Sequence, residues 1–192
     1  MSLDSGRITI LDANQIADLL TSARGPRDRS LIWVLSRTGC RLQEALSLDW
    51  GDIGDQEITI PWLKCRGRRR ARTIPLPGAR AILREWLGDA ETDADRLWPI
   101  HASTAWRWVR SAAARANLAR IHPHSLRHAY ACEWLRRGGD LTRLQHWLGH
   151  ATLATTSLYL HSCPADLAAE SRRIGMPSEG RPPVGKRRRH DA

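Results

Sequence analysis

The feature that most constrains the fold is the spacing of the apolar residues, which is helical along most of the chain and changes in one stretch. In Glu57-Ile-Thr-Ile-Pro, and again in Thr73-Ile-Pro-Leu, apolar and polar residues alternate as they do in half-buried strands. Trp62-Leu-Lys is a further candidate strand between them. Elsewhere apolar residues recur three and four positions apart, which is typical of amphipathic helices. We therefore expect a mainly α fold with a small antiparallel β-hairpin or three-stranded sheet.

Start and stop signals indicate where the helices lie. Asp12 is a candidate N-cap for the first helix, and Gly25-Pro26 separates that helix from the second, whose apolar residues are expected to be largely buried. Thr38-Gly39 is the turn before a short third helix. The expected helices span about residues 14–20, 27–37, 41–48, 79–87, 103–116, 124–137, 141–148, 153–161 and 164–174.

Length and composition predict one folded domain with short flanking segments. The chain has 192 residues, of which 42% are hydrophobic, and this is enough to bury a core. We expect a lead-in over residues 1–10, one domain over residues 11–176 and a disordered basic tail over residues 177–192. The sequence contains neither a secretory signal pattern nor an apolar run that could span a bilayer, so we expect a cytoplasmic protein.

The charge balance indicates a polyanionic partner. The formal net charge is +10, which favours nucleic acid first and an anionic membrane surface second, while an arginine-rich surface without such a role is the plain alternative. Lysine occurs only at Lys64 and Lys186, and the aromatic residues are nine Trp, two Tyr and no Phe. Because the core uses Trp for aromatic bulk, each tyrosine needs its own explanation.

The cysteines and histidines do not form a recognisable metal pattern. The four cysteines stand far apart with no CxxC pair, which excludes a zinc knuckle or ribbon, and their number is too low for a disulfide scaffold. We expect buried or idle thiols in a reducing compartment. His124, His128 and Cys132 lie four apart on one helix face and raise a metal site as an alternative. No carboxylate of the metalloprotease helix pattern accompanies them, so we expect no metal to bind there.

Four segments carry residues that suit chemistry on a phosphate. They are Thr38-Gly-Cys-Arg41-Leu-Gln-Glu44, Lys64 in the hairpin, His124-Ser-Leu-Arg127, and Leu148-Gly-His150 followed by Thr155-Thr-Ser-Leu-Tyr159. Each is weak alone, but their combined order and spacing resemble the tyrosine recombinase (phage integrase) family over roughly residues 10–175. The resemblance implies the tyrosine recombinase catalytic-domain fold and the family's activity, which is site-specific cleavage and rejoining of DNA without metal or ATP.

The resemblance also implies a role for each of these residues. Tyr159 attacks the DNA phosphate and forms a 3′-phosphotyrosyl intermediate. Arg41 and Arg127 bind the non-bridging oxygens, because a guanidinium group donates two parallel hydrogen bonds to a phosphate. His124 and His150 donate to the same phosphate or handle the tyrosine proton near neutral pH.

Lys64 is the candidate general acid for the departing 5′-oxygen, because lysine can be tuned to give up a proton and arginine cannot. It precedes Arg72 by eight residues, whereas the family hairpin is tighter. Either the loop is longer in this chain, or Arg66 takes part of this role. Glu44, one turn after Arg41, is expected to orient that arginine or to accept a histidine proton. Tyr130 is expected to have a packing role.

Further arginines are candidates for sequence-independent contacts with the DNA backbone. They are Arg66, Arg68, Arg69, Arg70 and Arg72 in the hairpin, and Arg107 and Arg110 on the helix near residues 103–116. A solvated basic loop is the alternative for the hairpin group. Trp106 and Trp108 are expected to lie in the core rather than to stack on bases.

The resemblance implies double-stranded DNA with a specific recombination site as the partner, and a homotetramer on two such sites. Residues 164–175 are a candidate segment for docking on a neighbouring protomer, and packing on their own subunit is the alternative. Family members usually carry an N-terminal core-binding domain of roughly one hundred residues. About ten residues precede the first expected helix, so we expect that domain to be absent, as in the short fimbrial-switch invertases, and a host DNA-bending protein to assist.

Two other functions use the same residues. One is a non-catalytic DNA-binding regulator derived from a recombinase, against which the complete residue set argues, because a binder needs no nucleophile. The other is a topoisomerase-like enzyme that nicks and reseals DNA, which relaxation of supercoils without a partner site would favour. The motifs are shared by enzymes that invert, excise, integrate or resolve DNA.

Overall fold

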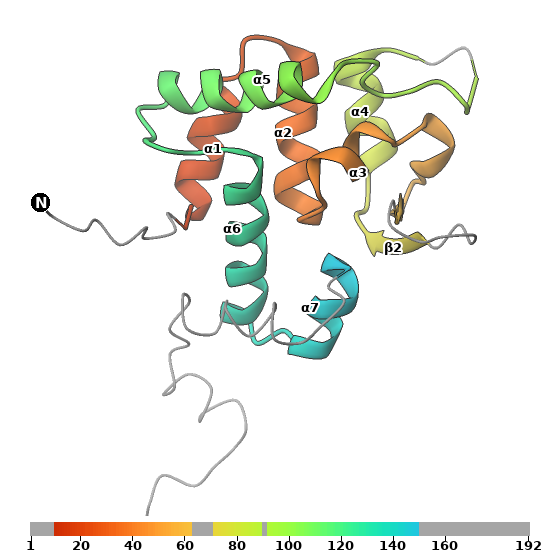
Figure 1. Cartoon of the computed structure of the whole chain (residues 1–192). Coiled ribbons are helices and arrows are strands. Elements are labelled where there is room, and N and C mark those ends of the chain that lie inside the picture. The colour runs from red at the N-terminus through yellow and green to blue at the C-terminus, as the bar shows by residue number, and fades with distance from the viewer. Residues whose placement is uncertain (1–9, 63–70, 90–91, 150–192) are drawn as a thin grey trace, which may run out of the picture.

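The computed structural model of the chain describes residues 10–62, 71–89 and 92–149. Within these ranges helices predominate, and a two-stranded antiparallel sheet lies at one side of the molecule (Figure 1). None of the helices in the described ranges has the length and apolar character needed to cross a membrane. The expected mainly α fold with a small antiparallel hairpin is confirmed.

The first two helices follow from local capping signals. α1 (Ala13–Thr21) begins after Asp12, whose carboxylate accepts a hydrogen bond from the backbone N–H of Gln15 at 2.9 Å. The Gln15 side chain in turn accepts from the backbone N–H of Asp12 at 3.0 Å, which completes a capping box. α2 (Pro26–Thr38) begins with proline at its first position and ends at Gly39, whose φ of 61° lies in the left-handed region.

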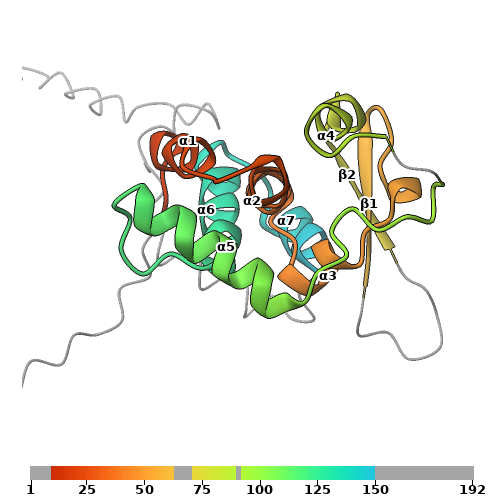
Figure 2. The ribbon, with the colours of Figure 1, turned by 90° about the horizontal axis from the view of Figure 1, so that it is seen from above.

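α2 is the central helix of the domain. It contacts α1, α4 (Ala79–Leu87), α5 (Ala102–Arg115) and α6 (Pro123–Arg136), so it is covered on several sides. Figure 2 shows α1, α5 and α6 grouped around it, with the hairpin at the opposite side of the molecule. Its apolar residues Leu31, Ile32, Val34 and Leu35 are completely buried, as the sequence predicts.

A short helical segment leads from α2 into the hairpin. α3 (Leu42–Leu46) and the 3₁₀ turn η1 (Trp50–Asp52) precede β1 (Glu57–Pro61), which pairs with β2 (Ala71–Pro75). The sheet within the described ranges therefore has two strands, and the candidate strand at Trp62 lies mostly outside those ranges.

The register of the hairpin sets one apolar face. Ile58 lies opposite Ile74, and Ile60 lies opposite Arg72. Directly opposed residues of an antiparallel pair point to the same side of the sheet, so these side chains share one face. All four are buried, whereas the intervening residues of β2 are exposed.

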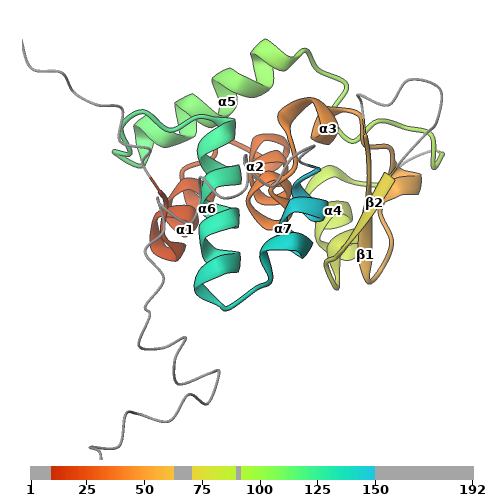
Figure 3. The ribbon, with the colours of Figure 1, turned by 60° about the horizontal axis from the view of Figure 1, so that its bottom comes forward.

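α7 (Leu141–Leu148) lies between the helical part and the hairpin. Asp140 caps its first turn by accepting from the backbone N–H of Arg143 at 2.8 Å, and Gly149, with φ of 65°, ends it. α7 contacts both α6 and β2, and Figure 3 shows it between these two elements. Its carboxyl end therefore lies where the helical part meets the hairpin.

The observed helices agree with the expected ones to within a few residues at each end. The helices expected at 153–161 and 164–174 lie outside the described residues, as do the basic tail and most of the lead-in. The division into residues 1–10, 11–176 and 177–192 stays a prediction.

Candidate active site

The first candidate residues lie at the joint between α2 and α3. Arg41 occupies the N-cap position of α3, and Glu44 lies three residues later in the first turn. The Glu44 carboxylate accepts from the backbone N–H of Arg41 at 2.9 Å and from Arg41 Nη1 at 3.0 Å. One carboxylate therefore holds both the backbone and the side chain of Arg41.

Arg72 extends this network from the hairpin. Its Nη2 donates to Glu44 Oε2 at 2.6 Å, and its side chain is 0% exposed. From the sequence, Arg72 is expected to contact the DNA backbone together with the other hairpin arginines, but the structure buries its side chain against Glu44. The alternation along β2 carries the signal for this position, because it puts Arg72 on the same face as the apolar Ile74.

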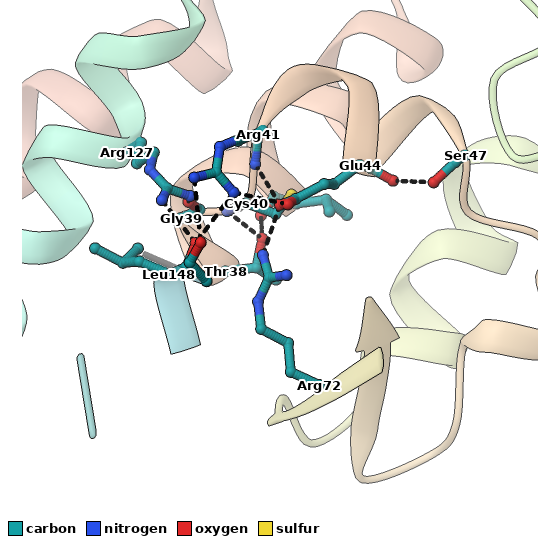
Figure 4. A network of polar contacts seen from close by, with 11 residues as sticks. Thr38, Gly39, Cys40, Arg41, Glu44, Ser47, Arg72, Arg127 and Leu148 are labelled. Atoms are coloured by element: carbon teal, nitrogen blue, oxygen red, sulfur yellow. Dashed lines mark hydrogen bonds and ion pairs between the residues drawn. The ribbon is translucent and has the colours of Figure 1, made fainter. Parts of the chain in front are cut away.

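Arg41 and Arg127 meet at the carboxyl end of α7 (Figure 4). Arg127 Nη2 donates to the carbonyl of Leu148 at 2.7 Å, and Arg41 Nη1 approaches the same oxygen at 3.5 Å. Arg41 Nη2 also donates to the carbonyl of Gly149 at 3.2 Å, and Arg127 Nη1 donates to that of Gly39 at 2.7 Å. Carbonyl groups at a helix C-terminus carry partial negative charge, which stabilises two cations in one place.

The three arginines differ in their exposure to solvent. The side chain of Arg41 is 38% exposed, whereas Arg127 and Arg72 are buried. Burial alone would raise the pKa of the Glu44 carboxyl. The hydrogen bond and positive charge of Arg72 oppose this effect, as do the backbone N–H and charge of Arg41, and the pKa is lowered overall. Glu44 is therefore ionised at neutral pH, and the cluster keeps an excess of positive charge.

His124 lies in the first turn of α6. Its pKa is lowered, first by partial desolvation and then by the positive charges of Arg127, His122 and Arg41. The ring is therefore mainly neutral at neutral pH, and one of its nitrogens is able to accept a proton. The pKa of His128, one turn further along α6, is also lowered, first by desolvation and then by neighbouring positive groups.

Cys132 does not extend the histidine pair into a metal site. It is disulfide-bonded and so offers no thiolate, and within residues 10–62, 71–89 and 92–149 no three His, Cys, Asp or Glu side chains are grouped to hold a metal ion. The expectation of free thiols is therefore wrong for Cys132. Cys40 is a free, buried cysteine, and burial raises the pKa of its thiol to about 11, which makes it a poor nucleophile.

The structure describes Tyr130, one of the two tyrosines in the chain. Burial raises the pKa of the Tyr130 hydroxyl to about 12. Its ring packs closely on Gly39, where an added Cβ would lie 2.6 Å from Tyr130 Cδ1. These features suit a packing residue and not a nucleophile. Tyr159, the candidate nucleophile, lies outside the described residues.

Other candidate residues are either outside the described ranges or apart from this network. Lys64, Arg66, Arg68, Arg69, Arg70 and His150 lie outside those ranges. On α5, Arg107 donates to Thr104 at 3.2 Å, and Arg110 lies over the Trp106 ring at 5.2 Å from its centroid. Both arginines are exposed, and these contacts stay within α5. Trp106 is 45% exposed, so its expected place in the core is wrong, while Trp108 is partly buried against the core.

Comparison with known protein families gives a match to the phage integrase family over residues 9–165. The match covers most of the chain and all the helices and strands described above. The chain belongs to the phage integrase family. The matched range also contains every residue from Arg41 to Tyr159 to which the sequence assigns a catalytic role.

Curated members of this family are similar over most of the chain. The tyrosine recombinase XerC of Herpetosiphon aurantiacus is 32% identical over 171 residues, which cover 80% of this chain and 55% of that protein. A tyrosine recombinase of Thermosipho africanus is 35% identical over 144 residues, which cover 70% of this chain and 50% of that protein. The chain thus spans about half the length of the curated relatives it matches.

Solved structures of the family share the fold. The crystal structure of XerA recombinase matches with a TM-score of 0.72 and 26% identity, over 94% of this chain and 68% of that one. The catalytic domain of bacteriophage HP1 integrase matches with a TM-score of 0.67 and 24% identity, over 90% of this chain and 99% of that one. The expected catalytic-domain fold is therefore confirmed.

Proposed function

We propose that this member of the phage integrase family is a site-specific DNA recombinase that cleaves and rejoins DNA through a 3′-phosphotyrosyl intermediate, without metal or ATP. The observation that carries the proposal is the convergence of Arg41 and Arg127 on the carbonyl of Leu148, directly before Gly149-His150. Two guanidinium groups in one place suit the non-bridging oxygens of one phosphate. Relatives that are named tyrosine recombinases support the same activity.

A bound phosphate would compete with the backbone for these arginines. Arg41 now donates to the carbonyls of Leu148 and Gly149 at 3.5 and 3.2 Å. A charged phosphate oxygen is a stronger acceptor than a neutral carbonyl, so substrate would take over these donors. Because Arg41 is the accessible arginine of the network, we assign it the first contact with the phosphate.

The proposed cleavage is an exchange of one phosphoester bond for another. The hydroxyl oxygen of Tyr159 attacks phosphorus, so the Tyr–O–P bond forms while the bond from phosphorus to the 5′-oxygen breaks. The tyrosine proton passes to a base, for which the neutral ring of His124, or His150, is the candidate. The 5′-oxygen takes its proton from Lys64, with Arg66 as the alternative. Rejoining reverses these transfers, and the phosphotyrosyl bond conserves the energy of the broken linkage.

The proposed substrate is double-stranded DNA with a specific recombination site. XerH recombinase, which is 26% identical with a TM-score of 0.66, was solved bound to its difH substrate in a pre-cleavage complex, and this supports a DNA partner. The net charge of +10 favours the same partner. The arginines assigned to backbone contacts are Arg66, Arg68, Arg69, Arg70, Arg107 and Arg110.

The proposed assembly is a homotetramer on two DNA sites in the cytoplasm, with a host DNA-bending protein as an accessory partner. Residues 164–175 are the segment proposed to dock on a neighbouring protomer. This assembly distinguishes recombination from nicking and resealing, because strand exchange needs two sites and relaxation of supercoils needs one.

The nucleophile is tested by trapping covalent DNA in cells that express the protein. We expect wild type to yield protein-linked DNA clustered at one sequence motif after rapid denaturation, and Tyr159→Phe to yield none while it still binds DNA. Tyr130→Phe is the matched control, because it removes the other hydroxyl of this kind, and it should still form adducts. Adducts that persist in Tyr159→Phe, or vanish only in Tyr130→Phe, would refute the assignment.

A further inference from the structure

The charged side chain of Arg72 lies on the apolar face of the hairpin. Ile60 is opposite it in the register, and Ile74 follows on the same face of β2, and both are buried. The side chain of Arg72 is itself 0% exposed. A buried guanidinium group loses its hydration, and replacing a buried ion pair by apolar side chains of similar volume is often neutral or stabilising. Fold stability alone therefore does not account for an arginine here.

The hydrogen bonds of Arg72 are directed to one group. Its Nη2 donates to Glu44 Oε2 at 2.6 Å, while Nε and Nη1 are buried without a hydrogen-bond partner among the described residues. Buried donors without partners cost stability. The contact with Glu44 is thus the feature that an arginine provides at this position and an apolar residue would not.

Glu44 links Arg72 to Arg41. Its Oε2 accepts from Arg72 Nη2 and from the backbone N–H of Arg41, and its Oε1 accepts from Arg41 Nη1 at 3.0 Å (Figure 4). With Oε2 held by two donors, the carboxylate does not rotate freely, so Oε1 stays directed at Arg41. Arg72 also balances the negative charge of Glu44, which leaves the charge of Arg41 available to an anion.

Arg41 and Arg72 approach the same point of the backbone. A Cβ built at Gly149 would lie 3.5 Å from Arg72 Nη1 and 3.6 Å from Arg41 Nη1. The two guanidinium groups therefore both lie close to Gly149, the residue that directly precedes His150. The side chain of Arg41 is 38% exposed and that of Arg72 is 0% exposed, so of these two arginines only Arg41 can be reached by an anion from solvent.

We propose that Arg72 is a positioning residue, which acts through Glu44 to hold Arg41 in the orientation that binds the scissile phosphate. The inference rests on the proposed function and deepens it by adding a residue to those with catalytic roles. In the sequence, β2 directly follows the segment that contains Lys64 and Arg66. Arg72 therefore connects β2, which follows the candidate acid Lys64 in the sequence, to Arg41, the candidate phosphate-binding arginine.

The first test is a double-mutant cycle in which the rate of covalent protein–DNA complex formation is measured. The substrate is a DNA duplex that carries the sequence motif identified in the adducts of wild type. We expect Arg72→Met to slow the reaction about 10- to 100-fold, as loss of a residue behind a catalytic group does. In an Arg41→Ala background the same change should slow it by less than about threefold, because its effect passes through Arg41. Equal slowing in both backgrounds would overturn the proposal.

The control for this cycle is Arg80→Met. Arg80 donates to the carbonyls of Trp50 and Ile53 and pairs with Asp93, away from Glu44. Loss of this arginine should leave the rate near that of wild type. A slowing by Arg80→Met as large as that by Arg72→Met would indicate a general loss of structure and contradict the proposal.

A methylphosphonate at the scissile position separates positioning from structural support. The methyl group removes the charge that Arg41 has to balance, so the slowing by Arg72→Met should fall to within about threefold of wild type on this substrate. Slowing of the same size on phosphate and methylphosphonate DNA would show a structural role and overturn the proposal.

An activity-independent measurement separates this inference from the proposed function. Arg72→Lys keeps the charge but not the planar fork, and NMR of the Arg41 guanidinium group reports its restraint directly. We expect rotation about the C–N bonds of the Arg41 guanidinium group to be about tenfold faster in Arg72→Lys, which is the factor that corresponds to the loss of one hydrogen bond. We also expect the NMR signals of this group to change less when inorganic phosphate is added. Unchanged rotation would refute the role of Arg72 even where wild type cleaves DNA. Restrained rotation in a wild type that forms no adducts would count against the proposed function instead.

Discussion

At the scale of single residues, the arginines of the site have two different tasks: one is to bind an anion, and the other is to hold the Glu44 carboxylate. Arg41 keeps 38% of its side chain exposed and Arg72 keeps none, yet both donate to Glu44. A carboxylate shared by two guanidinium groups neutralises only one of them, so positive charge remains on the exposed side for an anion. This division depends on an ionised Glu44.

Glu44 is expected to make the fold sensitive to acid. Its pKa in the folded protein lies below the ordinary value of 4.5, so its stabilisation is present above that value and is lost as the pH falls through the lower folded-state pKa. We expect Glu44→Gln to flatten the dependence of the free energy of unfolding on pH, measured with urea between about pH 7 and about pH 3. Glu57→Gln removes an exposed carboxyl at the start of β1 and is the control. The same pH dependence in wild type and Glu44→Gln would contradict this role.

The chemical type of the site residues is easier to predict from sequence than their exposure. Arg41 and Glu44 stand three apart on a predicted helix, so their contact is a local matter, and it is observed at 3.0 Å. The burial of Arg127 depends on the approach of Gly39 and Leu148, which are distant in sequence. No local sequence pattern predicts which distant segments cover Arg127. The burial of Arg72, in contrast, follows from the alternation along β2 once the buried face of the hairpin is known.

At the scale of elements, helix bounds are predictable because their signals are local. The capping box at Asp12, the proline at Pro26 and the glycine at Gly149 act on backbone groups within a few residues. The packing of one helix end on another element is not local. Gly39 ends α2 through its own conformation, but its close contact with Tyr130 arises only when α6 docks on α2.

Gly39 and Gly78 form a matched pair that separates these two effects. Both have positive φ, 61° and 77°, but a Cβ at Gly39 would meet Tyr130 at 2.6 Å, while none of the described atoms lies within 4 Å of a Cβ at Gly78. We expect Gly78→Ala to cost about 1 kcal/mol from backbone strain alone. Gly39→Ala should cost about 2–4 kcal/mol, because overpacking adds to the strain. Urea denaturation measures both, and equal costs would show that the contact with Tyr130 is not a constraint.

At the scale of the whole molecule, the fold brings together motifs that the sequence keeps apart. The α2–α3 joint supplies Arg41, α6 supplies Arg127, and the end of α7 supplies the carbonyl at which they meet. A family resemblance identifies such motifs by their order, but their convergence follows from α7 lying between α6 and β2. The formal net charge of +10 is likewise a property of the whole chain and not of the site alone.

That charge is expected to make DNA binding strongly salt-dependent, with the hairpin arginines as a main source. Each phosphate contact that is lost reduces the slope of log K against log salt by about 0.9, so Arg68→Ala, Arg69→Ala and Arg70→Ala together should reduce it by up to about 3. The control removes the same charge from arginines paired with acids elsewhere: Arg84 with Asp89, and Arg136 and Arg137 with Glu133. Fluorescence anisotropy with duplex DNA at several salt concentrations measures both slopes. If both triple variants lower the slope equally, net charge rather than hairpin contact controls binding. If only the hairpin variant lowers it, the hairpin arginines lie on the DNA backbone.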